Sequence, residues 1–173
     1  LFDTANELVG EGYDTVVSRL AAYTLPANIE QLVLDFVGGA VTGTGNGENN
    51  TIVGNFSNNT LNGEGGNDLL QGSLGNDTLN GGVGLDTLDG GIGSDEMNGS
   101  IGNDVYIVNS TGDVVNEFFL GGTDRIESSV AYTLGNFQEN LTLTGSGAIN
   151  GTGNGSANTI IGNGANNLLS GLG

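Results

Sequence analysis

Apolar side chains recur at every ninth residue through the middle of the chain, and each has polar or small neighbours. From Gly63 the sequence reads GEGGNDLLQ, GSLGNDTLN, GGVGLDTLD, GGIGSDEMN and GSIGNDVYI, with glycine at positions 1 and 4, aspartate at position 6 and an apolar residue at position 8. The apolar column is Leu70, Leu79, Leu88, Met97 and Tyr106. Glycine permits the backbone conformations of tight turns, and one apolar residue between polar ones suits a short strand with one inward side chain.

One inward residue per unit is a thin core, so two units are needed to close a coil around it. Three residues such as Thr78-Leu79-Asn80 would form each strand, and successive coils would stack at about 4.8 Å, the usual strand spacing. We therefore predict an all-β fold, a parallel β-roll or β-solenoid with two short strands and two turns per 18-residue coil. Leu70, Leu79, Leu88 and Met97 should alternate between the two sheets and meet inside.

The same register continues on both sides with altered chemistry, and a longer repeat overlies it. Position 6 is asparagine in units 45–53, 54–62, 153–161 and 162–170 (Asn50, Asn59, Asn158 and Asn167), whereas unit 108–116 keeps Asp113. In the longer repeat, residues 6–16 resemble 116–126, 22–34 resemble 131–143, and 43–55 resemble 151–163. These patterns predict a β-rich spacer (1–44), an asparagine-type coil (45–62), an aspartate-rich roll (63–116), a second spacer (117–150) and truncated asparagine-type coils (151–173).

Composition narrows the function. The 173 residues include 34 glycines, 20 acidic residues and two basic ones, for a net charge of −18, and they include no Cys or His. Disulfides, thiolate sites, imidazole bases and Ser-His-Asp triads are therefore excluded, and we expect no enzymatic activity. The negative charge argues against nucleic acid as a partner. No apolar stretch is long enough to insert into a membrane, and no targeting segment is visible. We expect the chain to be a fragment of a longer, tandemly repeated protein.

Low hydrophobicity with high net charge is typical of disorder, but also of a chain whose acidic groups are ligands. The spacing favours the second interpretation, because coils of 18 residues place Asp68 over Asp86 and Asp104. The same spacing places Asp77 over Asp95 and Asp113. Carboxylates about 5 Å apart repel by roughly a kcal/mol or more, so a cation must lie between them. Carboxylate and carbonyl oxygens suit calcium, at an affinity of about 10⁻⁴ to 10⁻³ M.

The GGxGxDxUx pattern of residues 63–107, where U is apolar, resembles the RTX (repeats-in-toxin) calcium-binding nonapeptide repeats. The resemblance implies a β-roll like those of serralysin C-terminal domains and alginate epimerase R-modules. It also implies three to four calcium ions, each held by two aspartates and by carbonyls of positions 2 and 4 of one loop and 1 and 3 of the next coil's loop. The implied sets are Glu64, Gly66 and Asp68 with Gly81, Val83 and Asp86; Ser73, Gly75 and Asp77 with Gly90, Ile92 and Asp95; Gly82, Gly84 and Asp86 with Gly99, Ile101 and Asp104; and Gly91, Gly93 and Asp95 with Val108, Ser110 and Asp113. The last loop departs from the glycine pattern.

Several alternatives stay open at this point. Asn50, Asn59, Asn158 and Asn167 could form weaker metal sites, but we favour an asparagine ladder that satisfies turn backbone. Polar rows that include Thr78, Asn80, Thr87 and Asn98 could bind polysaccharide or ice, or be ordinary strand exteriors. The favoured function is a calcium-binding module of a type I-secreted or cell-surface protein that folds on extracellular calcium. Neighbouring repeats of the parent chain are the expected protein partners. A polysaccharide-binding module and an ice-binding solenoid are the alternatives.

Overall fold

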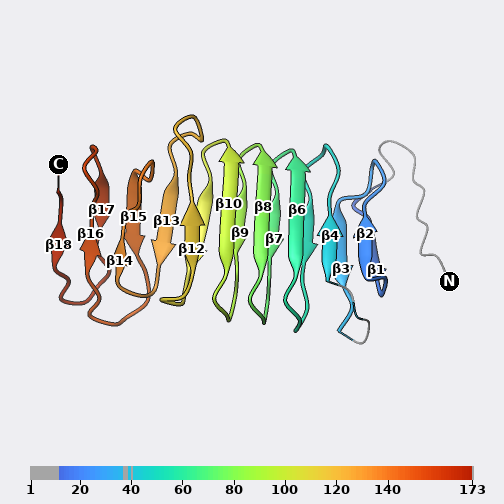
Figure 1. Cartoon of the computed structure of the whole chain (residues 1–173), viewed down its shortest axis with the longest axis horizontal. Helices are drawn as coiled ribbons and strands as arrows, with labels where there is room; N and C mark the ends of the chain where they lie inside the picture. The colour runs from blue at the N-terminus through green and yellow to red at the C-terminus, as the bar shows by residue number, and fades with distance from the viewer. Residues whose placement is uncertain (1–11, 37–38, 40, 173) are drawn as a thin grey trace.

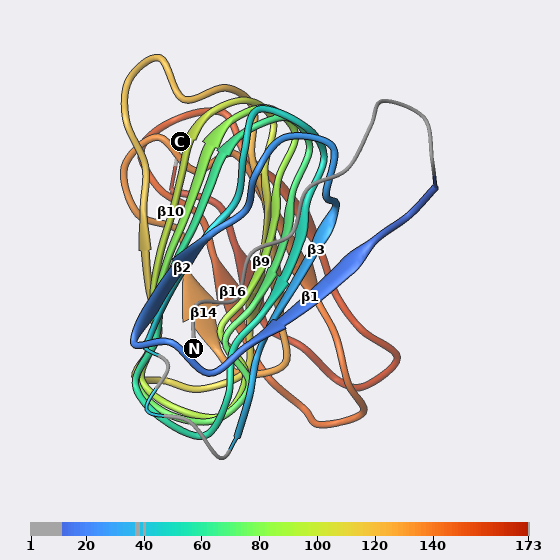
Figure 2. The same cartoon turned by 90° about the vertical axis from the view of Figure 1, so that its right-hand side faces the viewer.

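The chain folds into a flattened parallel β-solenoid, seen in a computed structural model that describes residues 12–36, 39 and 41–172 (Figure 1). Every strand pair in the described residues is parallel. The coils stack along the long axis, and the view down that axis shows two sheets facing each other across a narrow interior (Figure 2). The prediction of an all-β parallel roll is confirmed.

Three sheets make up the two faces. The first face is one sheet of nine strands, in the order β1 (Thr15–Ser18), β3 (Gln31–Leu34), β5 (Thr51–Val53), β7 (Leu69–Gln71), β9 (Thr87–Asp89), β11 (Val105–Val108), β13 (Arg125–Ser128), β15 (Asn140–Leu143) and β17 (Thr159–Ile161). The opposite face holds a six-stranded sheet of β2 (Ala22–Thr24), β4 (Thr42–Thr44), β6 (Thr60–Gly65), β8 (Thr78–Val83), β10 (Glu96–Ile101) and β12 (Val114–Asn116). A three-stranded sheet of β14 (Tyr132–Thr133), β16 (Gly151–Thr152) and β18 (Leu169–Ser170) continues that face.

The 18-residue register is confirmed through the centre of the molecule. Leu70 pairs with Leu88 in the first sheet, and Leu79 pairs with Met97 in the second. The position-8 residues Leu70, Leu79, Leu88, Met97 and Tyr106 are all fully buried. Because successive ones belong to opposite sheets, they meet in a single file of side chains between the two faces.

Strands of the second sheet are longer than predicted. β6, β8 and β10 each have six residues, whereas β7 and β9 have the three that the sequence indicates. The extra pairing joins Glu64 to Gly82 and Gly65 to Val83, within the glycine-rich half of the unit. The repeat is therefore asymmetric: one turn of each coil extends a strand of the second sheet, whereas the opposite turn contributes only an isolated bridge between Leu74 and Ile92.

The spacer segments add strands to the same two faces, with coils of unequal length. The register shift is 16 residues from β1 to β3, 20 from β3 to β5, 20 from β11 to β13 and 15 from β13 to β15. The predicted division into five regions stays a prediction, and its residues 1–11, 37–38, 40 and 173 lie outside the described part of the chain.

The longer repeat is visible in matching hydrogen bonds. The backbone N–H of Asp14 donates to Oε2 of Glu30 over 2.9 Å, and that of Asp124 donates to Oε2 of Glu139 over 3.0 Å. Both pairs link corresponding residues of the two long units.

The second face is divided between β12 and β14. These two strands belong to different sheets, while β11, β13 and β15 pair without interruption on the first face. The buried side chain of Gln138 bridges the division, since its Nε2 donates to the carbonyl of Val115 over 3.0 Å and its Oε1 accepts from the N–H of Gly135. Within the described residues, no helix has the length and apolar character to cross a membrane.

Candidate metal centre

Aspartates line the turns that lead from the second sheet back to the first. The backbone N–H of each residue donates to Oδ1 of the aspartate one coil further on: Asn50 to Asp68, Asp68 to Asp86, Asp86 to Asp104 and Asp104 to Asp124, over 2.7 to 2.8 Å. We call Asp68, Asp86, Asp104 and Asp124 the first aspartate column. The predicted stacking of Asp68, Asp86 and Asp104 follows from this register.

A second column lines the opposite turns. The N–H groups of Asn59 and Asp77 donate to Oδ1 of Asp77 and Asp95, and the N–H of Asp95 donates to Oδ1 of Asp113 over 3.2 Å. Asp77, Asp95 and Asp113 form the second aspartate column. One oxygen of each carboxylate thus holds the preceding coil in place.

The other oxygen has no such partner. In the described residues, Oδ2 of Asp68, Asp77, Asp86, Asp95, Asp104 and Asp124 is buried and accepts no hydrogen bond. Burial of an unpaired carboxylate oxygen costs roughly several kcal/mol of folding free energy unless a positively charged group or ion compensates it. The arginines do not lie on these atoms, since Arg19 pairs with Asp35 and Arg125 with Glu127. These six orphan oxygens have the chemistry of ligands that a hard cation such as calcium prefers.

Burial of these groups raises their pKa values. Desolvation raises the pKa of Asp68 to about 7. The negative charge of Asp86 also raises this pKa, and the hydrogen bond from the N–H of Asn50 lowers it. Desolvation likewise raises the pKa of Asp77 and of Asp104 to about 6. The pKa values of Asp86, Asp95 and Asp124 are raised for the same first reason. Without a cation, the folded turns favour protonated carboxyl groups.

Position-1 glycines bring the orphan oxygens close to backbone carbonyls. A Cβ added to Gly63 would lie within 3.0 Å of both Oδ2 of Asp68 and the carbonyl oxygen of Gly81. The same holds at Gly72 for Oδ2 of Asp77 and the carbonyl of Gly90. At Gly63 and Gly72, the aspartate oxygen and the position-1 carbonyl of the following coil therefore converge on one small space, which only glycine leaves open.

Carbonyls at positions 2 and 4 approach the next coil. The carbonyl oxygen of Glu64 lies within 3.0 Å of where a Cβ of Gly82 would be, and that of Gly66 lies equally close to the Cβ position of Gly84. Ser73 and Gly75 are placed in the same way against Gly91 and Gly93. Carbonyls at position 3 accept hydrogen bonds from position 4 of the preceding coil, as in Gly66 N–H to Val83, Gly75 N–H to Ile92 and Gly84 N–H to Ile101, over 2.9 to 3.0 Å. Their second lone pairs are not used by these bonds, and the ligand assignment stays a prediction.

The fourth implied set differs from the other three. Oδ2 of Asp113 already accepts hydrogen bonds from the N–H groups of Asn109 and Ser110, over 3.1 and 3.0 Å. Val108 ends strand β11 on the first face, and Ser110 lies in the turn beyond it. The loop without glycine therefore satisfies its own aspartate.

Asparagine replaces aspartate where the turn satisfies itself. Nδ2 of Asn50 donates to the carbonyl of Ile29 over 3.2 Å, Nδ2 of Asn158 to that of Gln138 over 3.1 Å, and Nδ2 of Asn167 to that of Ile149 over 2.7 Å. The amide NH₂ thus fills the role that a cation would fill beside an aspartate Oδ2. This geometry agrees with the asparagine ladder that we favoured.

Sequence reasoning missed Asp124. The coil from β11 to β13 has two residues more than the repeat, so Asp124 falls outside the nine-residue count. The available signal is the order Gly122-Thr123-Asp124, which parallels Gly102-Asn103-Asp104. Asp124 also lies near Asp104 and Glu117, with one carboxylate oxygen of each within 4.8 Å of the others.

The fold and its aspartate columns define a class of protein, the calcium-binding repeat solenoids. Comparison with known families matches the RTX calcium-binding nonapeptide repeat, in four copies, over residues 44–79, 71–106 and 152–173. Residues 44–106 and 152–173 therefore carry RTX calcium-binding nonapeptide repeats, as the resemblance predicted. Such repeats are typically structural and typically found in extracellular proteins. Searches of curated proteins and of solved structures gave no match to the chain.

Proposed function

We propose that this chain is the folding module of a type I-secreted or cell-surface protein, and that it folds when it binds extracellular calcium. The observation that carries the proposal is the set of six buried aspartate oxygens without a hydrogen-bond donor. A structure that buries such atoms is favourable only when a cation occupies the turns. The proposal includes no catalytic activity for the module.

Three sites are the best supported. They lie between Asp68 and Asp86, between Asp86 and Asp104, and between Asp77 and Asp95, each with the carbonyls given above. The gap between Asp95 and Asp113 is a weaker fourth, because Asn109 and Ser110 already donate to Asp113. Three to four ions are therefore expected, and Asp86 serves two of them.

Calcium acts by mass action. The chain carries a net charge of −18, and its interior is a single file of apolar side chains. Repulsion between the acidic groups and this thin core leave the metal-free chain unfolded at the low calcium concentration of the cytosol. In that state it can be exported as an extended chain. Outside the cell, an ion that binds only the folded state stabilises it by about 1.4 kcal/mol per site at a concentration ten times its dissociation constant. Several coupled sites make the transition steep.

The flanking coils give the module its place in an array. The spacers 1–44 and 117–150 supply strands to the same two faces as the calcium roll, and the asparagine coils need no metal to satisfy their turns. We infer that neighbouring repeats of the parent protein are the partners of this module, stacked end to end.

Polysaccharide or ice binding receives no support from the polar rows. Asn62, Asn80, Asn98 and Asn116 donate side-chain to side-chain along the second sheet, Asn80 to Asn62, Asn98 to Asn80 and Asn116 to Asn98, over 2.8 to 2.9 Å. These amides are used within the ladder, so the row acts as a strand exterior.

A calcium titration followed by circular dichroism and small-angle scattering tests the proposal. In calcium-stripped buffer at pH 7.5 or so we expect a coil spectrum and an expanded chain; millimolar calcium should give β-sheet signal and compaction. Magnesium at the same concentration is the control. It should induce much less folding, because Mg²⁺ is a smaller ion that requires near-octahedral coordination. A compact β-sheet chain in stripped buffer, or no response at several millimolar calcium, would contradict the proposal.

A further inference from the structure

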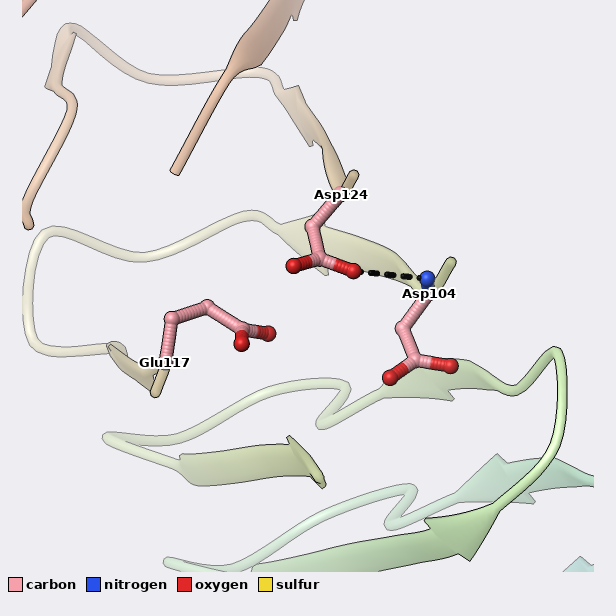
Figure 3. A group of neighbouring side chains, drawn as sticks. All are labelled: Asp104, Glu117 and Asp124. Atoms are coloured by element: carbon pink, nitrogen blue, oxygen red, sulfur yellow. Dashed lines mark hydrogen bonds between the residues drawn. The ribbon is translucent and has the colours of Figure 1, made fainter. Parts of the chain in front are cut away.

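Three acidic side chains face one another at the joint between the coils of β11 and β13. Asp104 and Asp124 come from successive turns of the first column, and Glu117 follows β12 (Figure 3). One carboxylate oxygen of each lies within 4.8 Å of the other two. Asp104 and Asp124 are each 1 % exposed, and Oδ2 of both is buried without a hydrogen-bond partner.

The two extra residues of this coil create the arrangement. The loop between β12 and β13 projects beyond the neighbouring turns, with Phe119 and Leu120 exposed (Figures 1 and 2). At its base, Glu117 occupies the place where the other coils present a position-1 glycine and its carbonyl. A side-chain carboxylate therefore enters the gap that elsewhere receives only a neutral backbone oxygen.

Tyr106 holds this glutamate in position. It is the only aromatic residue in the central apolar column and is fully buried. Its hydroxyl donates to Oε1 of Glu117 and accepts the N–H of Gly99 over 2.7 Å. A leucine, as in the other coils, could do neither. Oε2 of Glu117 also accepts the N–H of Phe118 over 3.2 Å, so the carboxylate is fixed at both oxygens.

We propose that Asp104, Glu117 and Asp124 form a calcium site of three carboxylates, tighter than the two-carboxylate sites of the regular coils, with Tyr106 as its positioning residue. The proposal rests on the same cation chemistry as the proposed function but adds a site outside the repeat pattern. More ligand charge in a rigid site raises calcium affinity. The sequence carries the same pair in the preceding long unit, where Glu7 and Asp14 correspond to Glu117 and Asp124 and Glu7 lies outside the described residues.

Terbium, which binds to calcium sites and emits when a nearby tyrosine absorbs, is the probe. The intact chain is titrated with terbium in the presence of calcium, and bound ions are counted by equilibrium dialysis. We expect the first ion bound to give tyrosine-sensitised emission, because the hydroxyl of Tyr106 donates to a ligand of the site. Glu117→Gln should remove this emission phase and weaken the tightest calcium site by about ten-fold or more.

Two further variants separate binding from structure. Tyr106→Phe should retain the ion count but lose the sensitised emission of the first ion. Glu48→Gln, which changes an exposed acidic residue outside both columns, is the matched control and should leave the first emission phase unchanged. If Glu117→Gln does not fold in saturating calcium, Asp124→Asn, which keeps the Oδ1 acceptor for Asp104, gives the same test.

An unchanged tightest site and an unchanged ion count in Glu117→Gln would overturn this inference, and would leave calcium-coupled folding intact. Loss of calcium-induced folding in the unaltered chain would instead overturn the proposed function. The two failures therefore give different results.

Discussion

The backbone N–H of Asp68 donates a 2.8 Å hydrogen bond to Oδ1 of Asp86, while Oδ2 of Asp86 is buried without a donor. One carboxylate thus has two tasks, since one oxygen joins adjacent coils and the other awaits a cation. The same division of roles is found at every aspartate of the two columns except Asp113, whose Oδ2 accepts the N–H groups of Asn109 and Ser110. It couples the stacking of coils to the binding of metal, because the same side chain takes part in both.

Asp86→Asn should damage two calcium sites at once. Asp86 borders the gap toward Asp68 and the gap toward Asp104, so we expect two fewer bound ions and a calcium midpoint for folding raised roughly ten-fold. Asparagine keeps an Oδ1 acceptor, so coil stacking is retained. Equilibrium dialysis and circular dichroism measure the two effects. Glu48→Gln, an exposed acidic residue outside the columns, is the control and should change neither. An unaltered ion count in Asp86→Asn would contradict the site assignment.

Acid should stabilise the metal-free fold. Burial raises the pKa of Asp68 from 3.8 to about 7, and those of Asp77 and Asp104 to about 6. The folded state therefore binds more protons than the unfolded state between these values. The resulting stability is fully present below about pH 4 and is lost as the pH rises through 6 to 7. In calcium-stripped buffer, circular dichroism should therefore show more β-sheet signal at pH 5 than at pH 8, where we expect a coil; equal spectra at the two pH values would contradict this prediction.

With calcium present, the direction reverses. Protons compete with the ion for the same oxygens, so the gain in β-sheet signal that calcium produces should be smaller at pH 5 than at pH 8. A calcium effect independent of pH would show that the aspartates are not the ligands.

Gly84→Ala should destabilise the roll. Gly84 has a φ of +149°, and an added Cβ would lie within 3.0 Å of the carbonyl oxygen of Gly66. We expect a loss of about 1 to 3 kcal/mol in the free energy of unfolding at saturating calcium. Gly47→Ala is the matched control, because a Cβ there meets nothing within 4 Å. Urea unfolding compares the two; equal stabilities would indicate that the loop relaxes freely.

Leu79→Ala should open a cavity between the sheets. Leu79 is fully buried in β8, and its neighbours in the file cannot close the gap without breaking the register. The expected loss is about 2 to 5 kcal/mol. Val83→Ala, on the same strand but 59 % exposed, should cost much less. Chemical denaturation at fixed calcium provides the comparison, and similar losses for both variants would argue against a core at position 8.

The sequence predicts the regular coils well because their chemistry is local. Glycine at positions 1 and 4 and one apolar residue at position 8 define the turn and the strand, so the register of Leu70 with Leu88 follows from counting. The nine-residue period no longer predicts the register where the coil length changes. Asp124 joins the first column only because the loop after β12 takes up two extra residues, and the nine-residue period cannot indicate such a change.

The role of Glu117 was also beyond the pattern. Its position beside Asp104 depends on the hydroxyl of Tyr106, a residue that the apolar pattern reads only as a core side chain. The six-residue strands β6, β8 and β10 are a similar case. Their glycine-rich ends predict a turn, but they also form strand pairs when the neighbouring coils are in register. Packing between coils decides both, and a single unit of sequence does not contain that information.

The division of one face has a mechanical meaning. The first sheet runs from β1 to β17 through one continuous hydrogen-bonded ladder, whereas the opposite face changes sheets between β12 and β14, with Gln138 as a side-chain bridge. A bend that opens the divided face stretches the hydrogen bond from Gln138 to Val115. A bend in the opposite direction strains the continuous hydrogen-bonded ladder of the first sheet. At this joint the solenoid should therefore bend more easily in the direction that opens the divided face than in the opposite direction.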